Sequence, residues 1–293
     1  MDETQSLRGN VHPSVAVLAY RPVFVRSAVC RVTAGSMLLS GIFTALCTVT
    51  SSNEDSRIGC AIATGVSITG FYHYTKLISI REQIVTHVKV STPGDVPRGQ
   101  ATELNAGWVD MAADSVRYSD WLVTLPLLVT EMHLLLANAA DPVWFGIPRA
   151  VMITCGMILL GSYTRLGTDE LIPIRNDQKM SMLDTFVRVS GLVAFALACM
   201  CLFVILYNLL GNVTTANDPT NGWILAFSIP WIGYGIVAAV PIAVRQVHPS
   251  GYPEALSIAK DLAYGALDVW SKAVFGFWIG ARALGVDELV FSF

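Results

Sequence analysis

Asp268 and Lys272 stand out because they place two opposite charges inside the apolar stretch 265–282. Residues four apart share one face of a helix, so a helical conformation would bring the two side chains together. A charge at membrane depth costs about 2.5 to 3.5 kcal/mol on insertion scales, and such residues usually face the protein interior and a partner. Lys272 is therefore the first candidate for a functional residue.

A second charged cluster lies in the segment 113–137. Arg117, Asp120, Thr124 and Glu131 are separated by 3, 4 and 7 residues, which places all four along one stripe of a helix. Asp120 and Glu131 would lie about 16 Å apart along the axis. Buried carboxylates in such a row are typical of a proton path. The alternative is a structural ion pair plus a glutamate that reaches from a helix end toward the membrane surface.

Four other polar or aromatic residues lie in apolar surroundings and indicate no function by themselves. His73 and Tyr74 are neighbours, and a histidine in such a place is usually a hydrogen-bonded core residue. Trp231 and Tyr234 have helical spacing and, taken alone, would be core aromatic residues.

The composition of the chain is that of a membrane protein. Of 293 residues, 53% are hydrophobic and only 14% are charged, which departs from ordinary soluble proteins. The net charge of −3 offers no basic surface, so nucleic acid is not an expected partner. The six cysteines have no zinc-binding spacing, and we predict no metal site.

Seven apolar runs of about 20 residues predict seven transmembrane helices in one all-α bundle, an integral multi-pass protein in contact with the lipid bilayer. The runs are 28–51, 57–80, 113–137, 145–165, 184–210, 222–244 and 256–283. We expect an exposed N-terminal segment at 1–27, the seven-helix domain at 28–284 and a short tail at 285–293.

Three motifs in these runs resemble those of microbial rhodopsins, the seven-helix retinal proteins. They are RYSDWLVTLPLL in the third run, WIGY in the sixth and LDVWSKAVFG in the seventh. The pair His73-Tyr74 and the glutamate at 131 are similar to the proteorhodopsin and xanthorhodopsin branch. The resemblance covers all seven runs and implies a light-driven proton pump, which is not an enzyme.

The resemblance implies that Lys272 binds all-trans retinal covalently as a protonated Schiff base. A desolvated lysine amine can attack an aldehyde, so the residue type suits this role. Asp120 and Asp268 would form the counterion, with Asp120 also the proton acceptor. Glu131 would be the proton donor, because a carboxyl in apolar surroundings can hold its proton until it is needed.

Further residues take supporting roles in the same resemblance. His73 would contact the acceptor, Thr124 would form a hydrogen bond with it, and Arg117 would stabilise the acceptor region toward the exit side. Tyr74 would donate a hydrogen bond to the counterion. The implied pocket walls are Trp121, Leu128, Met152, Gly156, Trp231 and Tyr234. Leucine at 128 goes with green absorption in this branch.

The chain also departs from the family pattern. Gly235 replaces a usual proline, so we expect the sixth helix to bend elsewhere, near Pro230. Ala238 replaces an aromatic residue, which predicts a looser pocket there. Lys260 and Asp261 stand where a glutamate of the bacteriorhodopsin release group would fall, which argues against fast proton release. Phe195 stands where a carotenoid antenna needs glycine, so we expect no antenna.

Orientation and rival functions stay open at this stage. Lys and Arg are concentrated on the side of the N-terminus, and the positive-inside rule places that side inside the cell. The family orientation is the opposite and implies outward pumping, whereas inverted insertion implies inward pumping.

Three other functions are alternatives to the pump. A sensory photoreceptor would share Lys272 but commonly lacks the donor carboxyl. A channel would need a polar pore, and a protein without retinal would keep Lys272 and Asp268 only as an ion pair. We expect a homo-oligomer, either a trimer or a pentamer.

Overall fold

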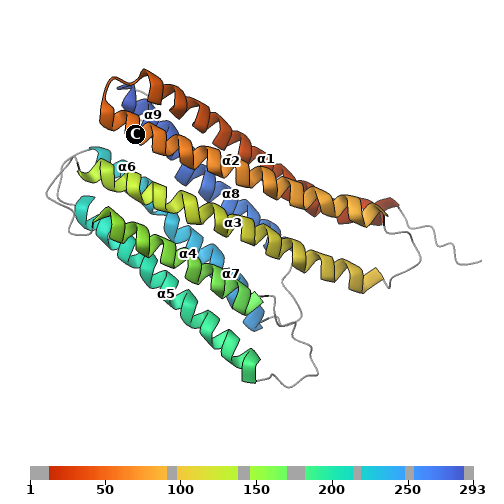
Figure 1. Ribbon diagram of the computed structural model, residues 1–293. Coiled ribbons are helices and arrows are strands. Elements are labelled where there is room, and N and C mark those ends of the chain that lie inside the picture. Colours follow the sequence, from red (N-terminus) through yellow and green to blue (C-terminus); the bar gives the residue numbers. More distant parts are fainter. Residues whose placement is uncertain are drawn as a thin grey trace, which may run out of the picture.

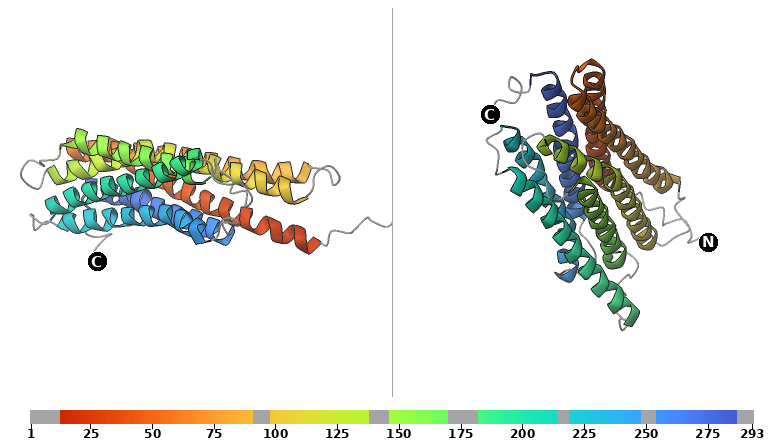
Figure 2. Two further views of the ribbon diagram at one scale, coloured as in Figure 1. Left: turned by 90° about the horizontal axis from the view of Figure 1, so that it is seen from below. Right: turned by 60° about the vertical axis from the view of Figure 1, so that its left-hand side comes forward.

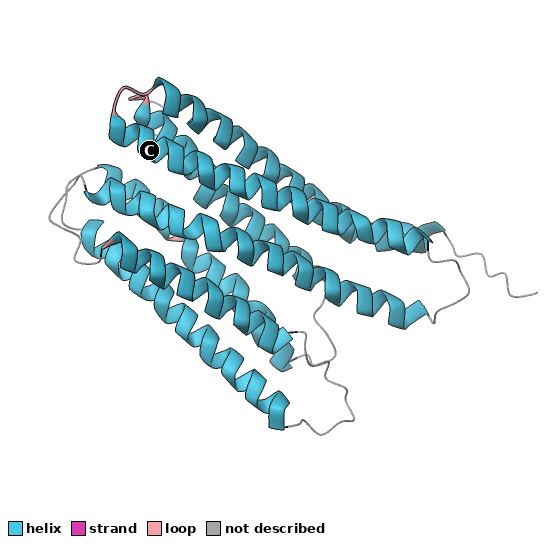
Figure 3. Ribbon diagram, viewed as in Figure 1, coloured by secondary structure: helices cyan, strands magenta, loops and turns pink. Residues whose placement is uncertain are grey.

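The computed structural model describes residues 13–90, 98–137, 146–169, 182–213, 219–247 and 254–286. These ranges are almost entirely helical and contain no strand (Figure 3). The helices run side by side with roughly parallel axes (Figure 1). Seen from below, they form an elongated bundle (Figure 2).

Each predicted apolar run is helical. The first five runs form α1 (Pro13–Thr50), α2 (Glu54–Val90), α3 (Arg98–Ala137), α4 (Ile147–Asp169) and α5 (Met182–Val213). The sixth is divided into α6 (Pro219–Ser228) and α7 (Pro230–Val247), and the seventh into α8 (Glu254–Asp268), a π-helical segment (Val269–Val274) and α9 (Phe275–Ala283). Within the described residues, the prediction of a seven-helix all-α bundle is confirmed.

Several helices extend beyond their apolar runs. Helix α1 begins at Pro13, within the segment predicted at 1–27; close to the predicted boundary, Phe24 is 74% exposed whereas Ser27 is buried. Helices α2 and α3 likewise continue into the stretch predicted to connect them. The extensions of α2 and α3 are rich in polar residues, and Arg21 and Arg26 interrupt the apolar residues at the start of α1, so no continuous apolar run covers these turns. Residues 1–12 and 287–293 of the predicted terminal segments lie outside the described residues.

The sixth helix breaks where the sequence predicted. Ile229 separates α6 from α7, and Pro230 follows at once. A proline lacks the backbone N–H that an α-helix needs and is tolerated at the first position of a new helix. The bend therefore lies before Trp231 and Tyr234.

Contacts between neighbours close the helices into a ring. Each of α1 to α5 contacts the next helix along the chain, and α8 and α9 pack against α1. Two glycines permit the last approach, because a Cβ atom at Gly276 would lie 2.5 Å from Ser40 Oγ and one at Gly280 would overlap Phe43. The segment that carries Lys272 is thus held firmly against α1.

Five spans in the described part of the chain are long and apolar enough to cross a membrane. They are Phe24–Thr50, Met111–Leu136, Ile147–Arg165, Thr185–Gly211 and Gly222–Val244. The second and seventh spans of the bundle are more charged, and the seventh is also interrupted by the π-helical segment. Several of these charges lie inside the bundle, as described next.

Candidate functional site

Lys272 lies in the π-helical segment and is completely buried. The Phe275 N–H donates to the carbonyl oxygens of both Trp270 and Lys272, the first being the wider bond of a π-helix. Short π-helical turns occur frequently at functional sites. The Lys272 ammonium donates a hydrogen bond to Asp120 Oδ2 and lies 3.1 Å from Asp268 Oδ1. Asp268 and Lys272 therefore face the interior of the bundle, and Asp120 of α3 lies opposite them.

Two tyrosine hydroxyls hold the Asp268 carboxylate. Tyr74 Oη donates to Oδ2 at 2.5 Å, and Tyr234 Oη donates to Oδ1 at 2.6 Å. The sequence predicted this role for Tyr74, whereas Tyr234 was predicted only as a pocket wall. Each carboxylate oxygen of Asp268 thus accepts from a hydroxyl, which stabilises its negative charge.

The Asp120 carboxylate accepts fewer hydrogen bonds than that of Asp268. Its Oδ1 lies 3.4 Å from Nδ1 of His73, which also lies 2.9 Å from the Thr69 carbonyl oxygen. Thr124 Oγ1 donates to the main-chain oxygen of Asp120 at 2.9 Å, so the threonine contacts Asp120 through the backbone rather than the carboxylate. Asp120 Oδ1 accepts no hydrogen bond from any described group.

Glu131 is buried farther along the same stripe of α3. Its side chain is 1% exposed, and neither carboxyl oxygen has a hydrogen-bond partner among the described residues. The alternative of a glutamate that reaches the surface is wrong. Leaving a buried polar group unsatisfied costs about 1–3 kcal/mol, so such a group calls for a function or for water.

A second layer of charges lies beyond Asp120 and Asp268. Asp114 precedes Asp120 by six residues, and Asp261 precedes Asp268 by seven, about 10 Å along each axis. Arg117 joins the two helices, because Nη1 lies 3.1 Å from Asp114 Oδ1 and Nη2 lies 2.6 Å from Asp261 Oδ1. The ion pairs of Arg117 are thus with this second layer.

Four more basic residues complete this layer. Asp261 Oδ2 accepts from Arg26 Nε and Arg81 Nη2, each at 2.5 Å. Asp114 Oδ2 accepts from Arg165 Nε at 2.6 Å and from Lys260 Nζ at 3.1 Å. Lys260 and Asp261 were predicted only as replacements for a release glutamate, and Asp114 was not predicted at all. Both acids are held in ion pairs inside the bundle.

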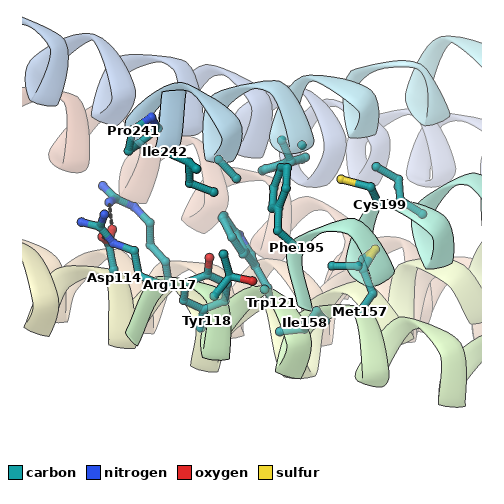
Figure 4. A pocket seen from close by; sticks show the side chains of 18 of the residues that line it. Asp114, Arg117, Tyr118, Trp121, Met157, Ile158, Phe195, Cys199, Pro241 and Ile242 are labelled. Carbon is teal, nitrogen blue, oxygen red and sulfur yellow. Dashed lines mark hydrogen bonds and ion pairs between the residues drawn. The ribbon is translucent and has the colours of Figure 1, made fainter. Parts of the chain in front are cut away.

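An apolar cavity of about 110 Å³ lies between α3, α4, α5, α7 and α8 (Figure 4). Its walls include Trp121 and Tyr234. The Trp121 ring packs edge-on against the rings of Tyr234 and Tyr264, with centroid distances of 5.3 and 5.1 Å. Gly235 and Ala238 also line it, and Ala238 is where the sequence predicted a looser pocket. Leu128 and Trp231 are buried in the adjoining core.

The two residues of α4 that were predicted as pocket walls do not line this cavity. Met152 is 71% exposed and points away from the bundle, and Gly156 does not line the cavity. Met157 and Gly161, each five residues later, line it instead. Helix α4 is apolar on several faces, so its sequence does not indicate which side turns inward.

The family model of bacteriorhodopsin-like proteins matches residues 26–285. The chain belongs to this family. It is therefore a microbial rhodopsin and an integral multi-pass membrane protein of a family that uses retinal. No curated protein sequence matches the chain.

Solved structures of other microbial rhodopsins share the fold. Thermophilic rhodopsin has 20% identity and a TM-score of 0.64, with 93% of this chain and 98% of that chain covered. Xanthorhodopsin, a light-driven ion pump with a dual chromophore, has 19% identity and a TM-score of 0.62, with coverages of 92% and 95%. The light-driven proton pump LR (Mac) from Leptosphaeria maculans has 21% identity and a TM-score of 0.58, with coverages of 89% and 96%.

The residues of this rhodopsin fit a retinal attached to Lys272. The amine is buried beside two carboxylates, which suits a positively charged linkage. Trp121 borders the cavity and follows Asp120 in the chain, while Tyr234 both lines the cavity and holds Asp268. Trp121 and Tyr234 therefore link the two carboxylates beside Lys272 to the wall of the cavity.

Proposed function

We propose that this rhodopsin is a light-driven proton pump. The observation that carries the proposal is the position of Asp120 and Glu131, two buried carboxyls on one stripe of α3, of which only Asp120 contacts Lys272. Retinal, bound to Lys272 as a protonated Schiff base, would supply the light absorption and the change of shape that starts transport. The protein residues would receive and return the proton.

The hydrogen bonds favour Asp120 over Asp268 as the proton acceptor. Tyr74 and Tyr234 already donate to both oxygens of Asp268, which stabilises its ionised form. Asp120 Oδ1 accepts no hydrogen bond from a described group, so it can take a proton without breaking one. In this proposal a proton leaves Lys272 Nζ for Asp120, and His73 positions the Asp120 carboxylate.

Glu131 would return a proton to Lys272 Nζ from the other side. Glu131 follows Asp120 by about three helical turns, and it is the intramembrane carboxyl on that part of the stripe. Because acceptor and donor lie on opposite sides of Lys272, a proton that passes from Glu131 to Asp120 moves in one direction. Vectorial transport follows from that order.

We propose the family orientation, which makes transport outward. Four of the basic residues that create the charge bias, Arg26, Arg81, Arg165 and Lys260, contact Asp114 or Asp261 inside the bundle. The positive-inside rule concerns basic residues in loops, so charges in interior ion pairs are weak evidence for an inverted insertion.

The second candidate function is that of a sensory photoreceptor, and the role of Glu131 distinguishes it from a proton pump. A pump needs a donor carboxyl to refill Lys272 quickly, whereas a sensor works with a slow cycle. The Glu131→Gln variant should keep its colour and reprotonate Lys272 much more slowly after a flash, which time-resolved absorption measures. An unchanged cycle from pH 5 to 9 would remove the donor role.

A further inference from the structure

A second cavity, of about 390 Å³, lies at the end of the bundle where α1 passes into α2. Its residues are of four kinds: polar groups at the start of α2, apolar walls, one exposed arginine of α9 and one buried acid. They are Asn53, Asp55, Ser56, Ile58, Gly59, Glu131, Leu134, Leu135, Ile279, Arg282 and Ala283. Asn53 and Asp55 are exposed, so the polar end faces the surface.

Glu131 forms the inner end of this cavity. The side chain is 1% exposed, and neither oxygen has a partner among the described residues although the residue lines the cavity. One water needs only about 10–15 Å³ of such space together with polar groups to bond. The cavity has room for many waters, and the carboxyl of Glu131 and the polar groups of the turn provide hydrogen-bonding sites at its two ends.

Gly59 controls the width of the cavity next to Glu131. A Cβ atom at this position would lie 3.6 Å from Ile279 Cγ2 and 4.0 Å from Glu131 Oε1. A small side chain therefore fits there, whereas a large one would fill the space between the turn and the carboxyl. Bulk at position 59 would separate Glu131 from the polar end.

We infer that this cavity is a water-filled vestibule that connects Glu131 with the adjacent aqueous phase in the resting protein, and that glycine at position 59 keeps it open. The inference rests on the proposed donor role of Glu131, since it names the route by which the donor is refilled. A proton reaches Glu131 through water in the vestibule, without any opening between helices.

Cysteine labelling in the dark tests the vestibule without a photocycle. The Gly59→Cys variant, bound to retinal, is treated with a small membrane-impermeant cationic methanethiosulfonate, and peptide mass spectrometry locates the modified cysteine. We expect modification at position 59. The matched control is Gly65→Cys on the same helix, where a Cβ atom meets nothing within 4 Å but no vestibule surface is present, and it should stay unmodified. An unmodified cysteine at 59 in coloured protein contradicts the vestibule.

The Gly59→Leu variant tests the route itself. We expect an unchanged dark spectrum and a several-fold slower reprotonation of Lys272 after a flash, while Gly65→Leu keeps the native rate. Reprotonation at the native rate in Gly59→Leu would exclude this path. The two proposals fail separately: labelling at 59 in a protein that does not pump would overturn only the proposed function, and absence of labelling in a protein that pumps would overturn only the vestibule.

Discussion

Burial should decide how much each ion pair of this rhodopsin contributes to stability, and two pairs permit a matched comparison. Arg81 Nη2 lies 2.5 Å from Asp261 Oδ2, with side chains 2% and 1% exposed. Arg31 Nη2 also lies 2.5 Å from Glu82 Oε1, but these side chains are 64% and 48% exposed. Each pair joins an arginine to a carboxylate of another helix at the same nitrogen–oxygen distance, so burial is the main difference.

The expected magnitudes follow from this difference. Removal of one partner of a buried pair costs about 3–5 kcal/mol, because an uncompensated charge stays in the interior. Asp261 also accepts from Arg26 and Arg117, so we expect Asp261→Asn to fall in the upper part of that range. Glu82→Gln breaks an exposed pair, and such pairs contribute about 0–1 kcal/mol.

The assay is unfolding of the retinal-bound protein in mixed detergent micelles by increasing amounts of sodium dodecyl sulfate, followed by the visible absorption band. The free energy of unfolding should fall by several kcal/mol in Asp261→Asn and by less than about 1 kcal/mol in Glu82→Gln. The double variant Arg81→Gln/Asp261→Asn should lose less than the sum of its single variants, because the two residues are in contact. Equal losses in Asp261→Asn and Glu82→Gln would refute the reasoning.

Two further predictions concern the retinal site. Lys272→Ala should abolish the visible band of protein supplied with retinal, since the amine that binds the chromophore is lost; colour that survived would show that another residue binds it. Met157→Ala should shift the absorption maximum because Met157 lines the cavity, whereas Met152→Ala should leave it unchanged because that side chain is 71% exposed, and the opposite result would restore the sequence-based register of α4.

The apolar runs predicted the seven helices because membrane depth requires about 20 apolar residues in each. The same property explains the errors at helix ends, as in α3, whose first turns are polar and carry no hydropathy signal. The contact between Asp268 and Lys272 was predictable from a spacing of four on one helix. The π-helical segment that holds Lys272 was not, since its wider hydrogen bonds leave no clear pattern in the sequence.

The second charged layer shows where sequence reasoning ends. Arg81 and Asp261 are 180 residues apart, and no periodicity within one helix relates them. A signal was present in Asp114, which lies three residues before Arg117 and so shares its face of α3. The orientation of α4 had no comparable signal, because a helix with apolar residues on several faces can present any of them to the core.

Light-driven movement of protons is the central claim, and one measurement tests it directly. Cells that produce the protein are supplied with retinal, and the pH of an unbuffered suspension is followed under illumination with and without a protonophore. Transport outward predicts acidification in the light that the protonophore abolishes. A change toward alkaline pH with the same sensitivity would mean inward transport and an inverted orientation. A coloured protein that leaves the pH unchanged would contradict the pump and favour the sensory photoreceptor.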